Sequence, residues 1–176
     1  MSKISLPPSG LTEDVLGEIR DEPEEIQLVV FTLGEQYGVP INQVQEIIRV
    51  GNITNVPNSP SYMEGVINLR GRVLSVLNLR KRLKLPVKDI TKASRIVITE
   101  VENKVIGLLV DAVSHVIKMR SELIENAPEE VLEIDTDYIT GVGKLKNQLV
   151  ILLDLGKLLK REKLDINEGG KSAAEN

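Results

Sequence analysis

Short apolar runs separated by turn residues dominate the chain, and none has the length or period of a long helix. The runs are rich in Val, Ile and Leu, which favour strands, and they come in pairs around Gly, Asn or charged turn residues. Such pairs predict β-hairpins. The predicted hairpins join residues 26–33 with 37–41, residues 65–69 with 73–79, and residues 95–101 with 105–110. Residues 44–50 are expected to form a helical turn that leads into a strand.

The order of these segments is repeated along the chain. Shifts of 69 and 76 residues superpose two sets of glycine, tyrosine and aliphatic positions, the second with a basic residue at the turn. The pairs are Gly38 with Gly107, Val44 with Val113, Ile48 with Ile117, Tyr62 with Tyr138, Gly65 with Gly141 and Arg70 with Lys146. We interpret this as an internal duplication. Each copy holds about five short strands, enough for a small barrel that removes most sheet edges.

The sequence therefore predicts an all-β fold of two five-stranded barrels related by a pseudo-twofold axis, with short helical turns and a C-terminal helix. The helix is expected over residues 154–163, which have an acidic start and a basic end. The predicted divisions are a mobile acidic tail (1–24), a single folded domain (25–164) with barrel subdomains at about 25–92 and 93–164, and a disordered tail (165–176).

Composition narrows the class of protein. The chain has 41% apolar residues but no Trp and one Phe, so its core must be built from aliphatic side chains. It has no Cys and one His, which removes disulfides, thiolate catalysis and Cys-based metal sites. No run approaches the roughly 20 apolar residues that span a bilayer, and the N-terminus lacks the apolar core of a secretory signal. We expect a cytoplasmic protein without direct membrane insertion.

Charge is distributed unevenly around the net value of −4. Residues 70–95 carry nine basic residues against Asp89, and residues 120–137 carry seven acids against Arg120. Opposed segments of this kind suit head-to-tail association or two solvated loops equally well. The basic segment also raises an alternative function, a small-barrel nucleic-acid-binding protein. It contains no aromatic residue on which bases would stack, so we expect no nucleic-acid partner.

Catalytic chemistry has no visible site in the sequence. His115 is the single histidine, and no Ser or carboxylate spacing marks a nucleophile or an orienting group around it. Phosphate-binding loops, dinucleotide fingerprints and calcium-loop spacing are also absent. We therefore predict a protein that is not an enzyme and that has no cofactor and no metal.

Four motifs carry a family resemblance: YGVPINQVQEI, YMEGVINLRGRVLSVLNLR, GLLVDAVSHVIKM and YITGVGKL. They resemble the chemotaxis coupling (adaptor) proteins of the CheW family, over about residues 25–159. The resemblance implies a pair of SH3-like barrels. It also implies a scaffold that joins the cytoplasmic tip of chemoreceptors to the regulatory domain of the histidine kinase CheA, with CheW-like domains contacting one another in rings.

The resemblance implies receptor-binding residues in the first copy, namely Val44, Glu46, Gly65, Asn68 and Arg70. The planar guanidinium of Arg70, in a predicted hairpin turn, suits a bidentate contact with a receptor helix or a bracing role in its own barrel. Gly65 is expected to act through the backbone, and Asn68 through side-chain hydrogen bonds to the turn. Glu46 aligns with His115 in the second copy, so the fold does not fix its type, whereas Val44 suits internal packing and partner contact equally.

For the kinase, the resemblance points to the loop that contains Glu125 and Glu130. The loop is acidic in this chain, where relatives of the family carry other residue types. Individual contacts therefore cannot be transferred to it, and both residues stay tentative kinase-binding positions.

Overall fold

The computed structural model describes residues 24–126 and 136–159 of the chain, and strands dominate them. The strands are β1 Glu25–Leu33, β2 Glu35–Pro40, β3 Val44–Arg49, β4 Met63–Leu69, β5 Arg72–Asn78, β6 Arg95–Val101, β7 Lys104–Val110, β8 Ala112–Arg120, β9 Ile124–Glu125, β10 Ile139–Leu145 and β11 Gln148–Leu153. Short helical elements are η1 Ile41–Gln43, α2 Leu79–Arg82, η2 Ser121–Leu123 and η4 Thr136–Tyr138. The predicted all-β class is confirmed.

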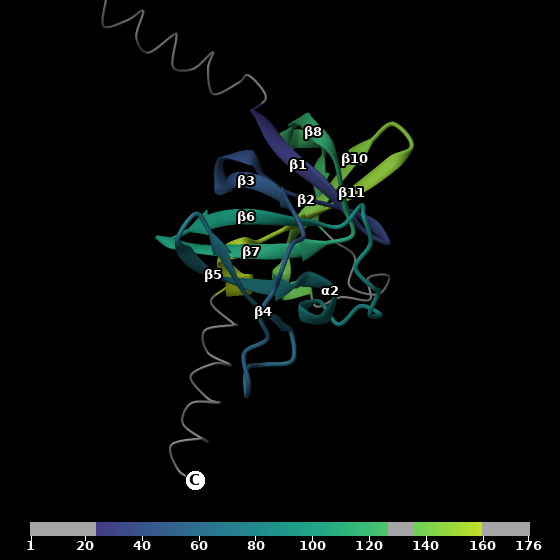
Figure 1. Ribbon diagram of the computed structural model, residues 1–176. Helices are drawn as coiled ribbons and strands as arrows, with labels where there is room; N and C mark the ends of the chain where they lie inside the picture. The colour runs from purple at the N-terminus through teal and green to yellow at the C-terminus, as the bar shows by residue number, and fades with distance from the viewer. Residues whose placement is uncertain (1–23, 127–135, 160–176) are drawn as a thin grey trace, which may run out of the picture.

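The strands form two sheets that lie against each other (Figure 1). One has the order β8-β1-β2-β11-β10-β9, and the other has the order β3-β6-β7-β5-β4. Each sheet curls so that its two edges approach each other. The segment that follows one edge strand then pairs with a strand at the opposite edge. Thr54, beyond β3, exchanges backbone hydrogen bonds of 2.9 and 2.8 Å with Val66 on β4, and β9, beyond β8, pairs with β10. Two small barrel-like units result.

The prediction that residues 25–92 and 93–164 form separate barrels is wrong, because the two copies exchange strands. β1 and β2 of the first copy pair with β8 and β11 of the second, while β6 and β7 of the second copy pair with β3 and β5 of the first. The physical reason is that each opening hairpin pairs with strands from the other copy. A sequence repeat specifies equivalent strands but not which copy supplies a strand's partner.

The duplication itself is confirmed by matched registers in the two sheets. Gly38 lies opposite Leu152 in the parallel pairing of β2 with β11, and Gly107 lies opposite Val76 in the equivalent pairing of β7 with β5. A Cβ on Gly38 would lie 3.1 Å from a methyl group of Val150, and one on Gly107 would lie 2.6 Å from Ile96. Both aligned glycines therefore leave room for a neighbouring side chain, which belongs to β11 beside Gly38 and to β6 beside Gly107.

Three apolar clusters hold the fold together. Two fill the barrel interiors: one contains Val76, Ile96 and Ile98, and the other contains Leu28 and Val30. The third and largest lies between the barrels and takes alternate residues of the same strands. Because side chains point to opposite faces along a strand, one strand supplies both a barrel interior and the shared core.

Helical turns end both copies in the same way. Asn78 Oδ1 accepts a hydrogen bond of 3.1 Å from Lys81 N at the start of α2, and Asp154 Oδ1 accepts one of 3.1 Å from Lys157 N. Residues 155–159 are helical, within the predicted closing helix of residues 154–163. Residues 160–163 and the expected tail of residues 165–176 lie outside the described part. At the other end, Glu24 O accepts a hydrogen bond of 2.7 Å from Ser121 N, and the rest of the expected tail of residues 1–24 lies outside the described residues.

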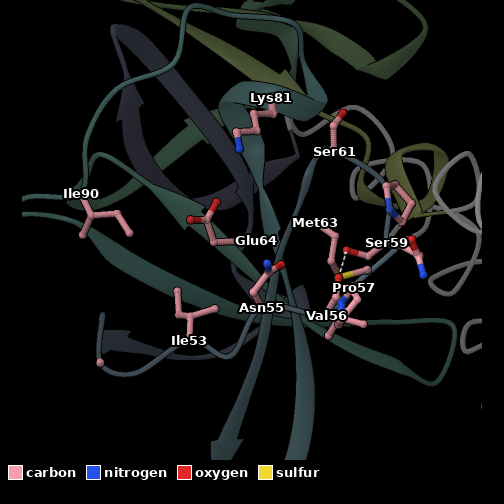
Figure 2. Close-up of a pocket in the computed structure, with 13 residues that line it drawn as sticks. Ile53, Asn55, Val56, Pro57, Ser59, Ser61, Met63, Glu64, Lys81 and Ile90 are labelled. Atoms are coloured by element: carbon pink, nitrogen blue, oxygen red, sulfur yellow. Dashed lines mark hydrogen bonds between the residues drawn. The ribbon is translucent and has the colours of Figure 1, made fainter.

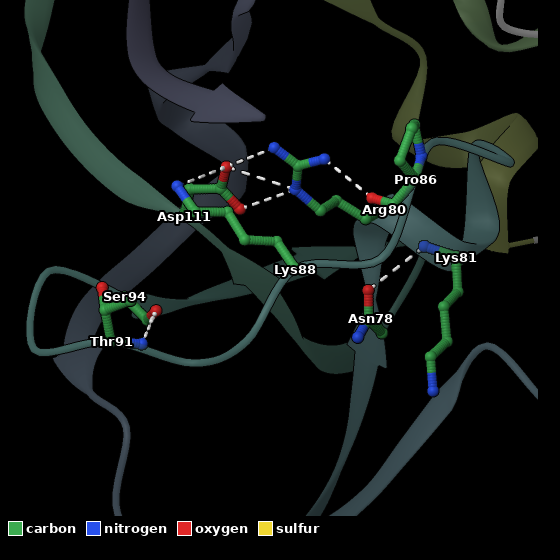
Figure 3. A network of polar contacts seen from close by, with 8 residues as sticks. All are labelled: Asn78, Arg80, Lys81, Pro86, Lys88, Thr91, Ser94 and Asp111. Atoms are coloured by element: carbon green, nitrogen blue, oxygen red, sulfur yellow. Dashed lines mark hydrogen bonds and ion pairs between the residues drawn. The ribbon is translucent and has the colours of Figure 1, made fainter. Parts of the chain in front are cut away.

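Part of the basic segment is held in contacts within the fold. The guanidinium of Arg80 donates to both carboxylate oxygens of Asp111, with Nε to Oδ1 at 2.9 Å and Nη2 to Oδ2 at 2.6 Å (Figure 3). Arg82 is buried, with its guanidinium 4.5 Å from the ring centre of Tyr62 and 5.1 Å from that of Tyr138. Arg80 and Arg82, two of the basic residues that motivated the nucleic-acid alternative, are therefore engaged in contacts within the fold.

Candidate partner-binding site

The β4–β5 turn presents Arg70 at the surface. Arg70 and Gly71 have φ angles of 50° and 86°, in the left-handed region that suits a two-residue hairpin turn. Asn68 Oδ1 accepts a hydrogen bond of 2.9 Å from Gly71 N, as expected for a residue that supports the turn. The side chain of Arg70 is 68% exposed. The turn thus directs a cation into solvent from a fixed backbone.

Glu46 on β3 holds that cation. Arg70 Nη1 donates to Glu46 Oε1 at 3.3 Å, and Arg70 Nη2 also contacts Glu46 Oε2. The hydrogen bonds and the opposite charge of Glu46 raise the pKa of Arg70 above its ordinary value. The two residues come from opposite edges of one sheet, so curling of the barrel brings them together. Sequence reasoning proposed both residues but not their pairing.

Val44 and Glu46 take different roles although both are half-buried. The pairing of β3 with β6 shifts between Val44 and Glu46, so Gln45 forms a bulge. Val44 packs against the shared core, while Glu46 turns to Arg70 at the surface. The internal alternative for Val44 therefore has direct structural support. Gln45 Nε2 donates to Glu100 on β6 at 2.5 Å, which ties the bulge to the neighbouring strand.

Gly65 permits a backbone crossing that no side chain would allow. Its φ is 150°, and a Cβ there would lie 2.2 Å from Thr54 O and 2.8 Å from the side chain of Ile53. Thr54 is the residue that closes the barrel onto β4. Gly65 thus acts through the backbone, as expected, and supports the hairpin that carries Arg70 without contributing a side chain to the surface.

Exposed aliphatic side chains accompany the charged pair. Ile47, next to Glu46, is 39% exposed, and Val73, close after the turn, is 72% exposed. Their burial could not be judged from the sequence, because each stands beside another aliphatic residue and the sequence does not say which of the two faces the core. β3 and β5 thus each expose one aliphatic side chain close in sequence to the ion pair or its turn.

The second copy carries a different version of this surface. His115 and Lys146 stand at the positions equivalent to Glu46 and Arg70, and Val116 and Leu149 are 50% and 59% exposed. Glu125 forms an ion pair of 2.8 Å with Lys144 on β10 and is exposed. Glu130, the other tentative kinase-binding residue, lies outside the described residues. Both copies thus expose aliphatic side chains at equivalent positions, and their charged residues at this surface differ.

The described residues offer no cluster of metal ligands and no helix that could cross a membrane. Within residues 24–126 and 136–159, no three His, Asp or Glu side chains gather as metal ligands would. In the described part of the chain, no helix is both long enough and apolar enough to cross a bilayer.

Comparison with known proteins gives a consistent result. A family model described as the CheW-like domain matches residues 27–163. The chemotaxis protein CheW of Klebsiella aerogenes is 34% identical over 139 residues, which cover 78% of this chain and 84% of the relative. The chemotaxis protein CheW of Bacillus subtilis is 38% identical over 138 residues, covering 77% and 88%.

A solved structure is similar as well. The crystal structure of the scaffolding protein TtCheW from Thermoanaerobacter tengcongensis has a TM-score of 0.70 and 38% sequence identity. The match covers 77% of this chain and 88% of that chain.

Proposed function

The chain belongs to the CheW-like family of chemotaxis scaffold proteins, and from this premise we propose that it is a non-enzymatic adaptor between chemoreceptors and the histidine kinase CheA. Its receptors are the methyl-accepting chemotaxis proteins, met at their cytoplasmic tip. It acts in the cytoplasm, recruited to membrane receptor arrays, and needs no cofactor. The regulatory domain of the kinase and further CheW-like domains, in rings, are its other partners.

The observation that carries the proposal is the exposed side chain of Arg70 on the β4–β5 turn, held by Glu46 of β3. A guanidinium that is already oriented by a carboxylate loses little conformational freedom when a partner binds. Arg70 presents its remaining donors to carboxylate or carbonyl oxygens of a receptor helix, whose apolar side chains meet the exposed aliphatic residues. Val44, Gly65 and Asn68 support this surface from behind.

The kinase contact is proposed for the second copy. Glu125 is exposed at the end of β9, and Glu130 follows in the same connection. Acidic side chains there suit a basic patch on the kinase regulatory domain. Separate surfaces on the two copies would let one chain hold receptor and kinase together.

The test is substitution of Arg70 by Asp. Aspartate tolerates the left-handed backbone at this position, so the turn should persist while the charge reverses. The matched control is Lys146→Asp at the equivalent turn, where φ is 41°. We expect R70D to lose at least about tenfold in affinity for a soluble receptor tip, and K146D to bind it like the unmodified chain. Binding is measured by co-sedimentation with receptor and kinase.

Both variants should keep the β-sheet circular dichroism spectrum, and R70D should lower the urea midpoint only slightly, because the pair that it breaks with Glu46 lies at the surface. Unchanged co-sedimentation of a folded R70D variant would remove Arg70 from the receptor site. An adaptor with unlike faces should also pull down the receptor tip and the kinase regulatory domain simultaneously.

A further inference from the structure

The five-stranded sheet is built from one continuous part of the chain. It contains β3 to β7, within residues 44–110, whereas the six-stranded sheet takes β1 and β2 from before this part and β8 to β11 from after it. In the described residues the chain passes between the two barrels at η1, before β3, and at Asp111, after β7. Two short connections leave a hinge, so side-chain contacts between the barrels must oppose rotation about the line that joins them.

Arg82 reaches from the five-stranded barrel to the six-stranded one. It is the last residue of α2, which follows β5. Its guanidinium lies 4.5 Å from the ring centre of Tyr62, just before β4, and 5.1 Å from that of Tyr138, just before β10. Arg82 Nη2 also donates a hydrogen bond of 3.2 Å to Leu158 O. One side chain thus contacts the start of β4 in one barrel and, in the other, the start of β10 and the closing helix.

The two tyrosines are equivalent residues of the two copies, and the backbone holds them alike. Asn78 N donates a hydrogen bond of 2.7 Å to Tyr62 O, and Asp154 N donates one of 2.8 Å to Tyr138 O. Each tyrosine is therefore tied to the residue that caps the helical turn of its own copy. The rings that meet the guanidinium are fixed parts of their barrels.

Arg82 breaks the symmetry of this arrangement. The same shift of 76 residues that superposes the tyrosines places Leu158 at its equivalent position, fully buried in the apolar cluster between the barrels. The duplicated fold therefore accepts an aliphatic side chain here, and burying a cation costs desolvation free energy that leucine avoids. A guanidinium differs from leucine in being planar and directional, whereas apolar contacts have no preferred direction.

Water is kept away from the guanidinium and the first ring. Ser61 and Lys81, the sequence neighbours of Tyr62 and Arg82, are exposed and line a hollow beside β4 (Figure 2). Tyr62 and Arg82 themselves are less than one tenth exposed, as is Tyr138. A cation over an aromatic ring is attracted more strongly when both are desolvated. Burial thus strengthens the contacts that Arg82 makes across the barrels.

We propose that Arg82 is a positioning residue, which sets the orientation of the two barrels by lying over Tyr62 of one and Tyr138 of the other. Rotation about the two connections would separate the guanidinium from one ring. Arg70 is at the end of β4 opposite to Tyr62, and Glu125 is on β9, which pairs with β10 beyond Tyr138. The proposed receptor and kinase surfaces are therefore held at one angle, a consequence that rests on the proposed adaptor function.

The orientation is measured by amide residual dipolar couplings of the isotope-labelled full chain in a weakly aligning medium, without partners. Couplings from both sheets of the unmodified chain should fit one alignment tensor. Arg82→Leu introduces the residue that the second copy has at this position. It should leave each sheet unchanged internally but raise the misfit of a common tensor at least about twofold, because the directional contact is lost.

Two further variants separate the cation from the space that it fills. Arg82→Lys keeps a cation that can lie over a ring, so it should restore the common tensor. Arg82→Met fills the space with a flexible apolar side chain and should behave like Arg82→Leu. The matched control is Leu158→Met, which alters the same apolar cluster at the equivalent position and should keep the common tensor. The amide spectrum of each variant shows whether it is folded.

The consequence for the adaptor is measured separately. Arg82 lies in neither proposed surface, so Arg82→Leu should bind the receptor tip alone, and the kinase regulatory domain alone, within about twofold of the unmodified chain. Co-sedimentation of both partners together should fall at least about threefold, because barrels free to rotate lose more conformational freedom when two oriented contacts form at once.

A common tensor that fits Arg82→Leu as well as the unmodified chain, or one that fits Arg82→Lys as poorly as Arg82→Leu, would overturn the assignment of the orientation to this cation. A changed orientation with unchanged joint co-sedimentation would overturn the positioning role. If the unmodified chain bound neither partner, the adaptor function would fail, while the dipolar couplings would still decide what Arg82 does.

Discussion

At the scale of single residues, the chain adopts positive φ angles at an exposed turn and at a close crossing of two segments. Arg70 adopts a left-handed conformation to carry its side chain into solvent, and Gly71 follows in the same region. Gly65 accepts a crossing against Thr54 that leaves no room for a Cβ. These positions show how a turn and a crossing, each local, fix the orientation of a surface side chain several residues away.

Gly65→Ala is expected to destabilise the protein by about 2–4 kcal/mol, because the added methyl group must displace backbone that closes the barrel. Urea denaturation followed by circular dichroism measures the change. Gly51→Ala is the control, since a Cβ at Gly51 meets nothing within 4 Å. Coincident denaturation curves for the two variants would contradict the assignment of strain to Gly65.

At the scale of elements, equivalent parts of the two copies have kept their geometry and changed their chemistry. α2 and the helix that begins at residue 155 are both capped by a side chain, an amide at Asn78 and a carboxylate at Asp154. Asn78 also uses its amide nitrogen to hold Glu64. The first copy thus needs an amide at a position where the second copy accepts an acid.

This difference predicts that exchanging Asn and Asp at the two caps has unequal effects on stability. Asn78→Asp keeps the cap but places a second carboxylate beside Glu64 in a buried setting, so it should cost about 1–2 kcal/mol of stability at neutral pH. Asp154→Asn should change stability by less than about 0.5 kcal/mol, because Asn and Asp cap helices equally well. Urea midpoints of both variants measure the contrast. Equal effects would mean that the contact with Glu64 contributes nothing.

At the scale of the whole molecule, the two copies cannot be separated by cutting the chain between them. Each sheet takes strands from both copies, and the largest apolar cluster lies between the sheets. Arg80 and Asp111 add a polar clasp, with each side chain only 13% exposed. Asp111 stands between β7 and β8, where the chain passes from one sheet to the other.

Fragments of residues 24–92 and 93–164 should therefore be unfolded alone and should fold when mixed in equal amounts. Each lacks the strands that pair with its own opening hairpin, and unpaired edges leave backbone groups unsatisfied. Circular dichroism and dispersion of NMR amide signals follow the reaction. A cooperative unfolding transition in either fragment alone would show that the copies are independent units.

Asp111→Ala should destabilise the fold by about 3 kcal/mol, because it leaves the largely buried guanidinium of Arg80 without its counter-charge. The double variant Arg80→Met with Asp111→Leu should recover most of that loss. Urea is the denaturant of choice, since guanidinium salts screen charges. A double variant no more stable than the single one would show that the clasp itself, and not the stranded charge, carries the stability.

The pH dependence of this clasp has a definite sign. Hydrogen bonding to Asp111 raises the pKa of Arg80 above its ordinary value. A raised pKa means that Arg80 contributes its stability fully below that ordinary value and loses it only in strongly alkaline solution. Arg80 should therefore add no slope to a plot of stability against pH between about pH 5 and pH 8, the range in which proteins are usually most stable.

The sequence by itself determined the duplication and most of the elements, although the helical turn expected within residues 44–50 lies at Ile41–Gln43. Runs rich in Val, Ile and Leu, with turn residues between them, specify strands locally, and the aligned glycines mark positions where neighbouring segments approach closely. Arg70, Gly65 and Asn68 were proposed from the family resemblance, and the predicted hairpin turn suggested a local role for each. These features depend on neighbours along the chain, so they can be read without the fold.

Only the tertiary structure decided which strands pair, because a repeat gives both copies the same edges and either copy can supply the partner. Three-dimensional closure also joined Arg70 to Glu46 across the barrel. Contacts between residues far apart in sequence depend on how the barrels close and pack. That geometry is set by the whole chain at once and leaves no local trace in the order of amino acids.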